Sequence, residues 1–169
     1  MRRALDRLYD ATAWLAALFM IGTLAMVLAA IAGRLLNWYL PGTDAYAGYC
    51  MAASGFLALA HTLKRGEHIR VTLVLEHVGP AARHRIEIWA LTVATLLAFA
   101  FAWYSVHLAW QSYDFNDIST ANDATPLWIP QIAMALGAVV LFVAFVDELM
   151  LELRGERRAR MPEEALHNE

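Results

Sequence analysis

The chain has 169 residues, enough for one domain, and 60% of them are hydrophobic, with a formal net charge of −3. A mean hydropathy of +0.45 is too high for a soluble domain of this size, so the composition predicts an integral membrane protein. The single cysteine, Cys50, excludes an internal disulfide framework and a cysteine-rich metal site.

The first apolar segment follows a short, arginine-rich N-terminus. Residues 11–33 contain no charged side chain, and a run of this length suffices for one membrane-spanning helix. The Ala-Ile-Ala sequence at 30–32 is similar to a signal-peptidase site, but the apolar run is longer than a signal peptide requires, so we expect no cleavage. Ala25, Ala29 and Gly33 lie four residues apart and form a small-residue stripe that would let another helix approach closely.

A short connection separates the first apolar run from the second. It holds Trp38 and Tyr39, which are typical anchors at a membrane interface, and a Pro-Gly turn at 41–42. The second run, residues 45–63, carries no charge and is just long enough to cross the hydrocarbon core.

Two more apolar runs complete the membrane part. The third extends over residues 88–113, with Glu87 at its entry, and an acidic segment without Lys or Arg leads to the fourth. We therefore expect an all-α membrane protein with four transmembrane helices. The predicted regions are a cytoplasmic N-terminus at 1–11, a four-helix membrane domain at 12–151 with spans at about 12–35, 45–63, 86–112 and 126–148, and a cytoplasmic charged tail at 152–169.

A basic, half-apolar stretch lies between the second and third spans. Val71, Val74, Leu75 and Val78 follow helical spacing and predict an amphipathic helix at about 67–79. Alternating apolar residues also suit a strand, but a lone strand at a bilayer would leave its backbone groups without hydrogen-bond partners. Such a helix is roughly 18 Å long, shorter than the roughly 30 Å hydrocarbon core, so we expect it to lie along the surface.

The positions of Lys and Arg predict the orientation. All 13 except Arg34 fall before the first span, between the second and third, or after the fourth. With both termini in the cytoplasm, these cations obey the positive-inside rule, and Arg34 can extend to the outer interface. The surface helix then meets anionic lipid headgroups on the cytoplasmic side.

The spans carry none of the residues expected of a transport pathway. Arg34, Glu87, Asp147 and Glu148 lie at the ends of the spans, and no Asp, Glu, Lys or Arg lies deeper inside them. An ion-coupled carrier usually needs an ionisable residue at membrane depth. The chain is therefore not expected to form the pathway alone. Because phosphate-binding loops, nucleophile motifs and paired carboxylates are also missing from the sequence, we expect neither an enzyme nor a bound cofactor.

The histidines indicate an alternative class, the haem-binding membrane anchor of a respiratory redox complex. His61 and His107 would lie at different depths, which argues against their ligating one haem. His68 and His77 are nine residues apart and do not share a helix face, so together with His61 and His84 they predict no metal site.

Four stretches of the sequence resemble one family of membrane proteins. The most specific is Gly66-Glu67-His68-Ile69-Arg70-Val71, directly after the second span. The others are the Pro-Gly-Thr-Asp turn at 41–44, residues 55–60 before the basic turn, and the Thr-Pro-Leu-Trp-Ile-Pro sequence at 125–130. In these features the chain resembles the small permease subunit, of the DctQ type, of tripartite ATP-independent periplasmic (TRAP) transporters.

This resemblance implies an accessory or scaffold subunit in the bacterial cytoplasmic (inner) membrane. Its partners would be a large permease subunit and a periplasmic substrate-binding protein, and the complex would take up an organic acid, such as a C4-dicarboxylate, together with sodium. Selectivity would then reside in the other two proteins.

The resemblance also indicates which residues act at interfaces. The motif that would contact lipid or the partner at the cytoplasmic face comprises Lys64, Arg65, Gly66, Glu67, His68, Ile69, Arg70 and Val71. Residues expected to pack against the partner are Ala25, Ala29, Gly33, Asp44, Pro126, Trp128 and Pro130. One departure concerns a glutamate that family members often carry just after the Pro-turn: here Ala45 and Tyr46 follow Asp44, so its role would have passed to Asp44 or been lost.

Overall fold

The computed structural model describes residues 2–38, 40–65 and 79–155. Within these ranges the chain forms four α-helices and no β-strand; an isolated bridge joins Ile118 to Pro126. The helices are α1 (Arg2–Leu35), α2 (Thr43–Lys64), α4 (Pro80–Asp114) and α5 (Trp128–Leu153). The all-α prediction is therefore confirmed for the described residues, while all but the last residue of the predicted surface helix at 67–79 lies outside them.

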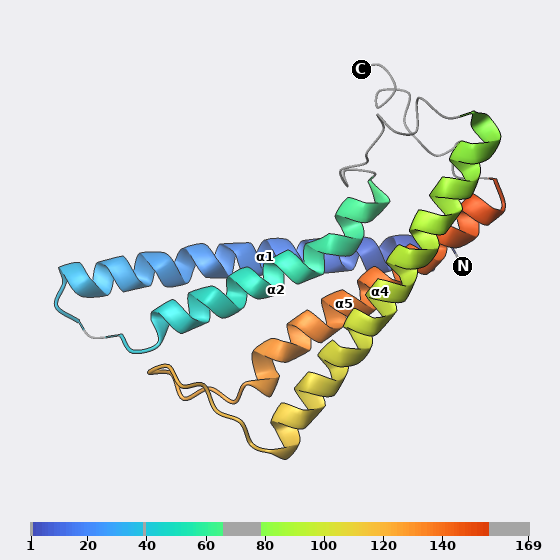
Figure 1. Ribbon diagram of the computed structural model, residues 1–169. Coiled ribbons are helices and arrows are strands. Elements are labelled where there is room, and N and C mark those ends of the chain that lie inside the picture. The colour runs from blue at the N-terminus through green and yellow to red at the C-terminus, as the bar shows by residue number, and fades with distance from the viewer. Residues whose placement is uncertain (1, 39, 66–78, 156–169) are drawn as a thin grey trace.

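The helices form two hairpins that are joined through their inner members. Helix α1 packs along α2, α4 packs along α5, and α2 contacts α5, so the spatial order is α1, α2, α5, α4 (Figure 1). The hairpins converge at the end where the N-terminus lies, which we call the N-terminal end. They spread apart toward their loops, residues 36–42 and 115–127, and we call this the loop end (Figure 1).

Small side chains let α2 and α5 cross closely. Ala53, Leu57 and Ala60 of α2 are buried, as are Gly137 and Ala138 of α5. Toward the N-terminal end this contact continues into a core of Tyr9, Ala60, Leu63, Val140 and Ala144. In this core Tyr9 places α1 against the two inner helices, and it is one of the largest fully buried side chains.

Three of the described helices are long and apolar enough to cross a membrane, over Ala4–Leu35, Ala82–Asp114 and Trp128–Leu153. Helix α2, which carries Tyr46, Tyr49 and His61, is not among them. Its 22 residues correspond to about 33 Å, which is sufficient by length alone. Three helices thus have the length and composition of the expected spans, and the total of four, with α2 among them, stays a prediction.

The Gly79-Pro80 pair belongs to the start of α4. Gly79 is extended and caps α4, and Pro80 occupies the first turn. Proline suits this position because its missing N–H would have no helical partner there. The third helix therefore begins six residues before the expected span at 86.

Candidate partner-binding faces and polar clusters

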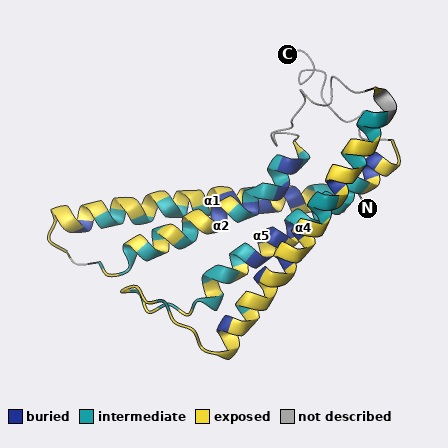
Figure 2. Ribbon diagram, in the orientation of Figure 1, coloured by how far each residue is buried: buried dark blue, intermediate teal, exposed yellow. Residues whose placement is uncertain are grey.

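The outer helices present broad apolar faces to their surroundings. Trp14 of α1 is 79% exposed and Trp103 of α4 is 64% exposed. Figure 2 shows exposed residues along most of both helices, whereas buried ones gather where α2 meets α5. Further exposed apolar residues are Leu18, Ile21, Leu24, Leu28, Ile31 and Leu35 on α1, and Trp89, Leu96, Leu97, Tyr104, Trp110 and Tyr113 on α4. Faces of this size require lipid or protein against them.

The predicted small-residue stripe of α1 has mixed surroundings. Ala25 is exposed, Ala29 is half-buried and Gly33 is buried. A Cβ at Gly33 would lie 2.8 Å from the Trp38 carbonyl oxygen, so this glycine serves the turn after α1. At Gly22, which sequence reasoning did not single out, a Cβ would lie 3.3 Å from the Cys50 Sγ of α2. Partner packing by the stripe stays a prediction.

Lys64, the first residue of the basic motif, is bound to α1. Its Nζ lies 2.7 Å from Asp6 Oδ1 and 5.5 Å from the centre of the Tyr9 ring. The following Arg65 is exposed, and its backbone N–H donates to the His61 carbonyl oxygen at 3.1 Å. Lys64 is thus engaged within the chain, and Arg65 is accessible. The other motif residues, 66–71, lie outside the described ranges.

A cluster of polar and charged side chains joins α4 to α5 at the N-terminal end. His84 Nδ1 lies 2.8 Å from Glu152 Oε1, and the Glu152 side chain is only 4% exposed. Arg83 Nε donates to Glu87 Oε1 at 3.1 Å. One ligand atom each from His84, Glu87 and Glu152 lies within 4.8 Å of the others, a donor set suited to a divalent cation. Because Arg83 and His84 already engage both carboxylates, the cluster can clasp α4 to α5 without a metal ion.

The two histidines considered for haem are not brought together. His61 lies on α2 with its Nδ1 3.8 Å from Asp10 Oδ1, toward the N-terminal end. His107 is exposed on α4, seven residues before that helix ends at the loop end. A pair of axial ligands for one haem needs a common depth and facing helices, and this arrangement provides neither.

At the loop end, the loop 115–127 is hydrogen-bonded to the start of α2. Tyr49 donates its hydroxyl to Ser119 Oγ at 2.9 Å, and Ser119 donates to Asp123 Oδ1 at 2.8 Å. The hydroxyls of Thr125 and Tyr46 are hydrogen-bonded to each other at 3.1 Å. We call Tyr46, Tyr49, Ser119, Asp123 and Thr125 the loop clasp. It ties the α4–α5 connection to the other hairpin.

The loop clasp also stabilises the charge of Asp123. Hydrogen bonding from Thr125, and less strongly from Ser119, lowers the pKa of the Asp123 carboxyl below its ordinary 3.8. Sequence reasoning missed this network. Tyr46 and Tyr49 are three residues apart and so share one face of α2, but their partners lie 70 or more residues further along the chain.

The proline-tryptophan sequence closes the α4–α5 hairpin. Pro126 pairs with Ile118 in the isolated bridge, and Leu127 N–H donates to the Asp117 carbonyl oxygen at 2.9 Å. Trp128 begins α5 and stacks edge-to-face on Tyr113 at the end of α4, with ring centres 5.7 Å apart. Pro130 lies in the first turn, where its missing N–H has no helical role. Pro126, Trp128 and Pro130 thus each have a structural role within this chain. Their contact with a partner subunit stays a prediction.

These features define a class: an all-α, multi-pass membrane protein whose outer faces require lipid or protein against them. The sequence matches the family described as "Tripartite ATP-independent periplasmic transporters, DctQ component" over residues 23–155. The chain therefore belongs to the DctQ family and is the small membrane component of a TRAP transporter, which confirms the resemblance seen in the sequence. No curated protein matches the chain at a significant level.

Proposed function

We propose that the chain is a scaffold subunit that supports sodium-coupled uptake of an organic acid, such as a C4-dicarboxylate. A large permease subunit would carry the substrate and sodium sites, and a periplasmic binding protein would deliver the substrate. The observation that carries this proposal is where the charges lie. Within the helices, charged side chains are confined to the ends: α1 has none between Asp10 and Arg34, and α4 none between Glu87 and Asp114.

A carrier for an organic anion and sodium needs charged or strongly polar ligands at membrane depth. Helix α5 likewise carries no charge before Asp147, and α2 none between Asp44 and Lys64. The central parts of the four helices are therefore uncharged, and a larger subunit can pack against them within the membrane. Its exposed faces on α1 and α4 supply the area for that contact.

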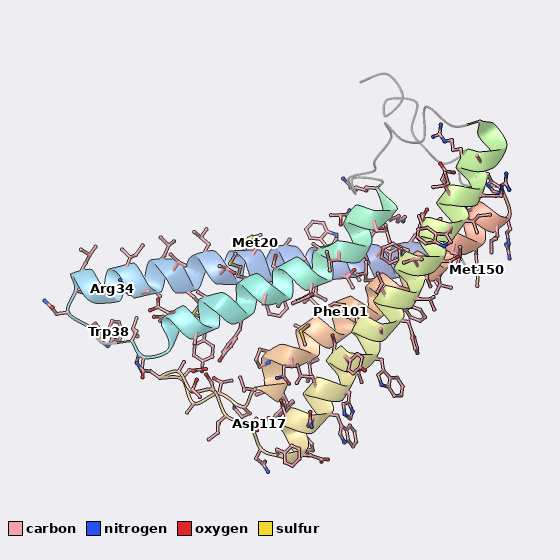
Figure 3. All side chains as sticks on the ribbon, viewed as in Figure 1. Met20, Arg34, Trp38, Phe101, Asp117 and Met150 are labelled. Carbon is pink, nitrogen blue, oxygen red and sulfur yellow. The ribbon has the colours of Figure 1, made fainter. Side chains whose placement is uncertain are left out.

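We further propose that all four helices span the bacterial inner membrane with both termini in the cytoplasm. Helix α2 lies between α1 and α5, so its polar residues can face protein instead of lipid. Among the described residues, every Lys and Arg except Arg34 belongs to the N-terminal end, opposite the Arg34 and Trp38 turn (Figure 3). The positive-inside rule then supports a cytoplasmic location for the N-terminal end.

A transport assay tests the proposal. Proteoliposomes containing the large permease and this chain, with the binding protein outside, should accumulate a labelled dicarboxylate only when an inward sodium gradient is present. Liposomes with the permease alone should show little uptake. Uptake at the same rate without this chain, or accumulation by this chain alone, would contradict the scaffold role.

A further inference from the structure

A cavity of about 700 Å³ lies at the loop end, between the end of α1 and the start of α2. Its volume falls within the roughly 300–1,000 Å³ that is usual for small-molecule sites. Polar groups from four segments line it: Arg34 from α1, Asn37 from the connection, Asp44 from α2 and Asn122 from the loop 115–127. Trp38 and Pro41 supply apolar surface.

Backbone geometry forms this cavity. Trp38 N–H donates to the Gly33 carbonyl oxygen at 2.8 Å, and Asn37 and Gly42 have positive φ angles of 54° and 79°. A Cβ at Gly42 would lie 2.8 Å from the Asp123 Cβ, so the loop rests directly on this glycine. The connection and the loop are thus held against each other by backbone contact as well as by the loop clasp.

The cavity carries one charge of each sign. Arg34 Nη2 lies 3.6 Å from Asp44 Oδ2, longer than a charge-assisted hydrogen bond, and the two side chains are 77% and 83% exposed. Both groups therefore keep donors and acceptors for a ligand. Arg34 is also the one Lys or Arg at the loop end among the residues that the structure describes.

The cavity adjoins the membrane interface. The charge-free run of α1 ends at Gly33, directly before Arg34. Leu35, Leu36 and Trp38 beside the cavity are all exposed. An apolar flank next to a charged pocket is the arrangement that a phospholipid requires, because its acyl chains must stay in the hydrocarbon region while its headgroup is bound.

We propose that this cavity binds the headgroup of a zwitterionic phospholipid with a primary ammonium, such as phosphatidylethanolamine. The phosphate would pair with the Arg34 guanidinium, a donor whose planar fork suits phosphate oxygens. The ammonium would donate to the Asp44 carboxylate. The side-chain amides of Asn37 and Asn122 would provide further donors and acceptors for the glycerol and phosphate oxygens. This inference depends on α1 meeting the lipid interface and not on the proposed transport role.

The paired charges predict the selectivity. An anionic headgroup without an ammonium, as in phosphatidylglycerol, would leave Asp44 without a cation and bring a second negative charge beside it. A choline headgroup would carry the right charge, but its quaternary nitrogen has no N–H to donate to a carboxylate. We therefore expect phosphatidylethanolamine to bind more tightly than either lipid.

Native mass spectrometry of the full chain in mild detergent tests the proposal, with equal amounts of the three lipids supplied. The wild-type chain should retain phosphatidylethanolamine over phosphatidylglycerol by about tenfold, the effect of one charge-assisted hydrogen bond. Arg34→Gln should lose most of this binding, and Asp44→Asn should shift the preference toward phosphatidylglycerol. Arg7→Gln, which removes an exposed cation at the N-terminal end, is the matched control and should behave as wild type.

Three results would overturn the proposal. They are equal retention of phosphatidylethanolamine and phosphatidylglycerol by the wild type, undiminished lipid binding by the folded Arg34→Gln chain, and unchanged selectivity in Asp44→Asn. Because both side chains are largely exposed, circular dichroism should show that the variants fold. Water-soluble glycerophosphoethanolamine should not displace the lipid at equal concentration, and its doing so would assign the cavity to a soluble ligand.

Discussion

Gly137 of α5 lies directly against the backbone of Phe56 of α2: a Cβ at position 137 would lie 2.5 Å from the Phe56 carbonyl oxygen. No side chain fits this space unless one helix moves. This crossing is where the two hairpins meet, since α1 barely contacts α5 and α4 packs mainly on α5. A single glycine therefore sets how closely the two halves of the molecule approach.

Replacing Gly137 with alanine should destabilise the chain by about 1–3 kcal/mol, the usual effect of overpacking a tight contact. The measurement is the free energy of unfolding in mixed micelles, titrated with a denaturing detergent. Gly55→Ala is the matched control, because a Cβ there meets no atom within 4 Å. That substitution should be neutral or slightly stabilising, since alanine favours a helix. Equal effects of the two substitutions would argue against the close crossing.

The loop clasp should depend on the Tyr49 hydroxyl. Tyr49→Phe removes the donor to Ser119 and should reduce stability by about 0.5–1.5 kcal/mol, the net value of one hydrogen bond. The mobility of a spin label at the exposed Ala121 should increase as the loop loosens. Tyr104→Phe, an exposed tyrosine on α4, is the control and should leave the label unchanged. A label equally mobile in wild type and Tyr49→Phe would show that the bond does not hold the loop.

The loop clasp should also loosen in acid. Because the hydroxyls of Thr125 and Ser119 lower the pKa of Asp123 below 3.8, its carboxylate stabilises the folded loop above that pH. The contribution is lost as the pH falls through the lowered pKa and the carboxyl is protonated. The same spin label should be immobile from neutral pH down to about pH 4 and become mobile below it. Asp123→Asn should abolish this transition, and a transition that persists in this variant must come from another group.

The Lys64–Asp6 ion pair should couple α2 to α1 measurably. Lys64 Nζ lies 2.7 Å from Asp6 Oδ1, and the two side chains are 29% and 42% exposed. Solvent therefore screens the attraction between their charges in part. A double-mutant cycle with Lys64→Gln and Asp6→Asn should give a coupling energy of up to about 1 kcal/mol. The same cycle at Arg34 and Asp44, which are more exposed and 3.6 Å apart, should give a smaller value. The reverse order would contradict the geometry.

Local patterns in the sequence predicted the all-helical fold of the described residues, because the length and apolar content of a helix can be read from one continuous segment. The start of α4 at Pro80 was harder to predict from the sequence, because a proline can follow the end of one helix or begin the next. The close approach of Gly137 to Phe56 was not predictable, because it joins residues that are distant in the chain. The loop clasp escaped notice for the same reason. Family resemblance identified the transporter class, which helix packing alone would not.

As the small membrane subunit of a TRAP transporter, this chain should be bound to a larger permease in the cell. The most direct measurement is affinity purification of the tagged full chain from its native membranes in mild detergent, with the bound proteins identified and the visible spectrum recorded on the same sample. We predict stoichiometric recovery of a many-span permease and no Soret band. Recovery of the chain alone, or with a haem band and redox subunits, would contradict the claim.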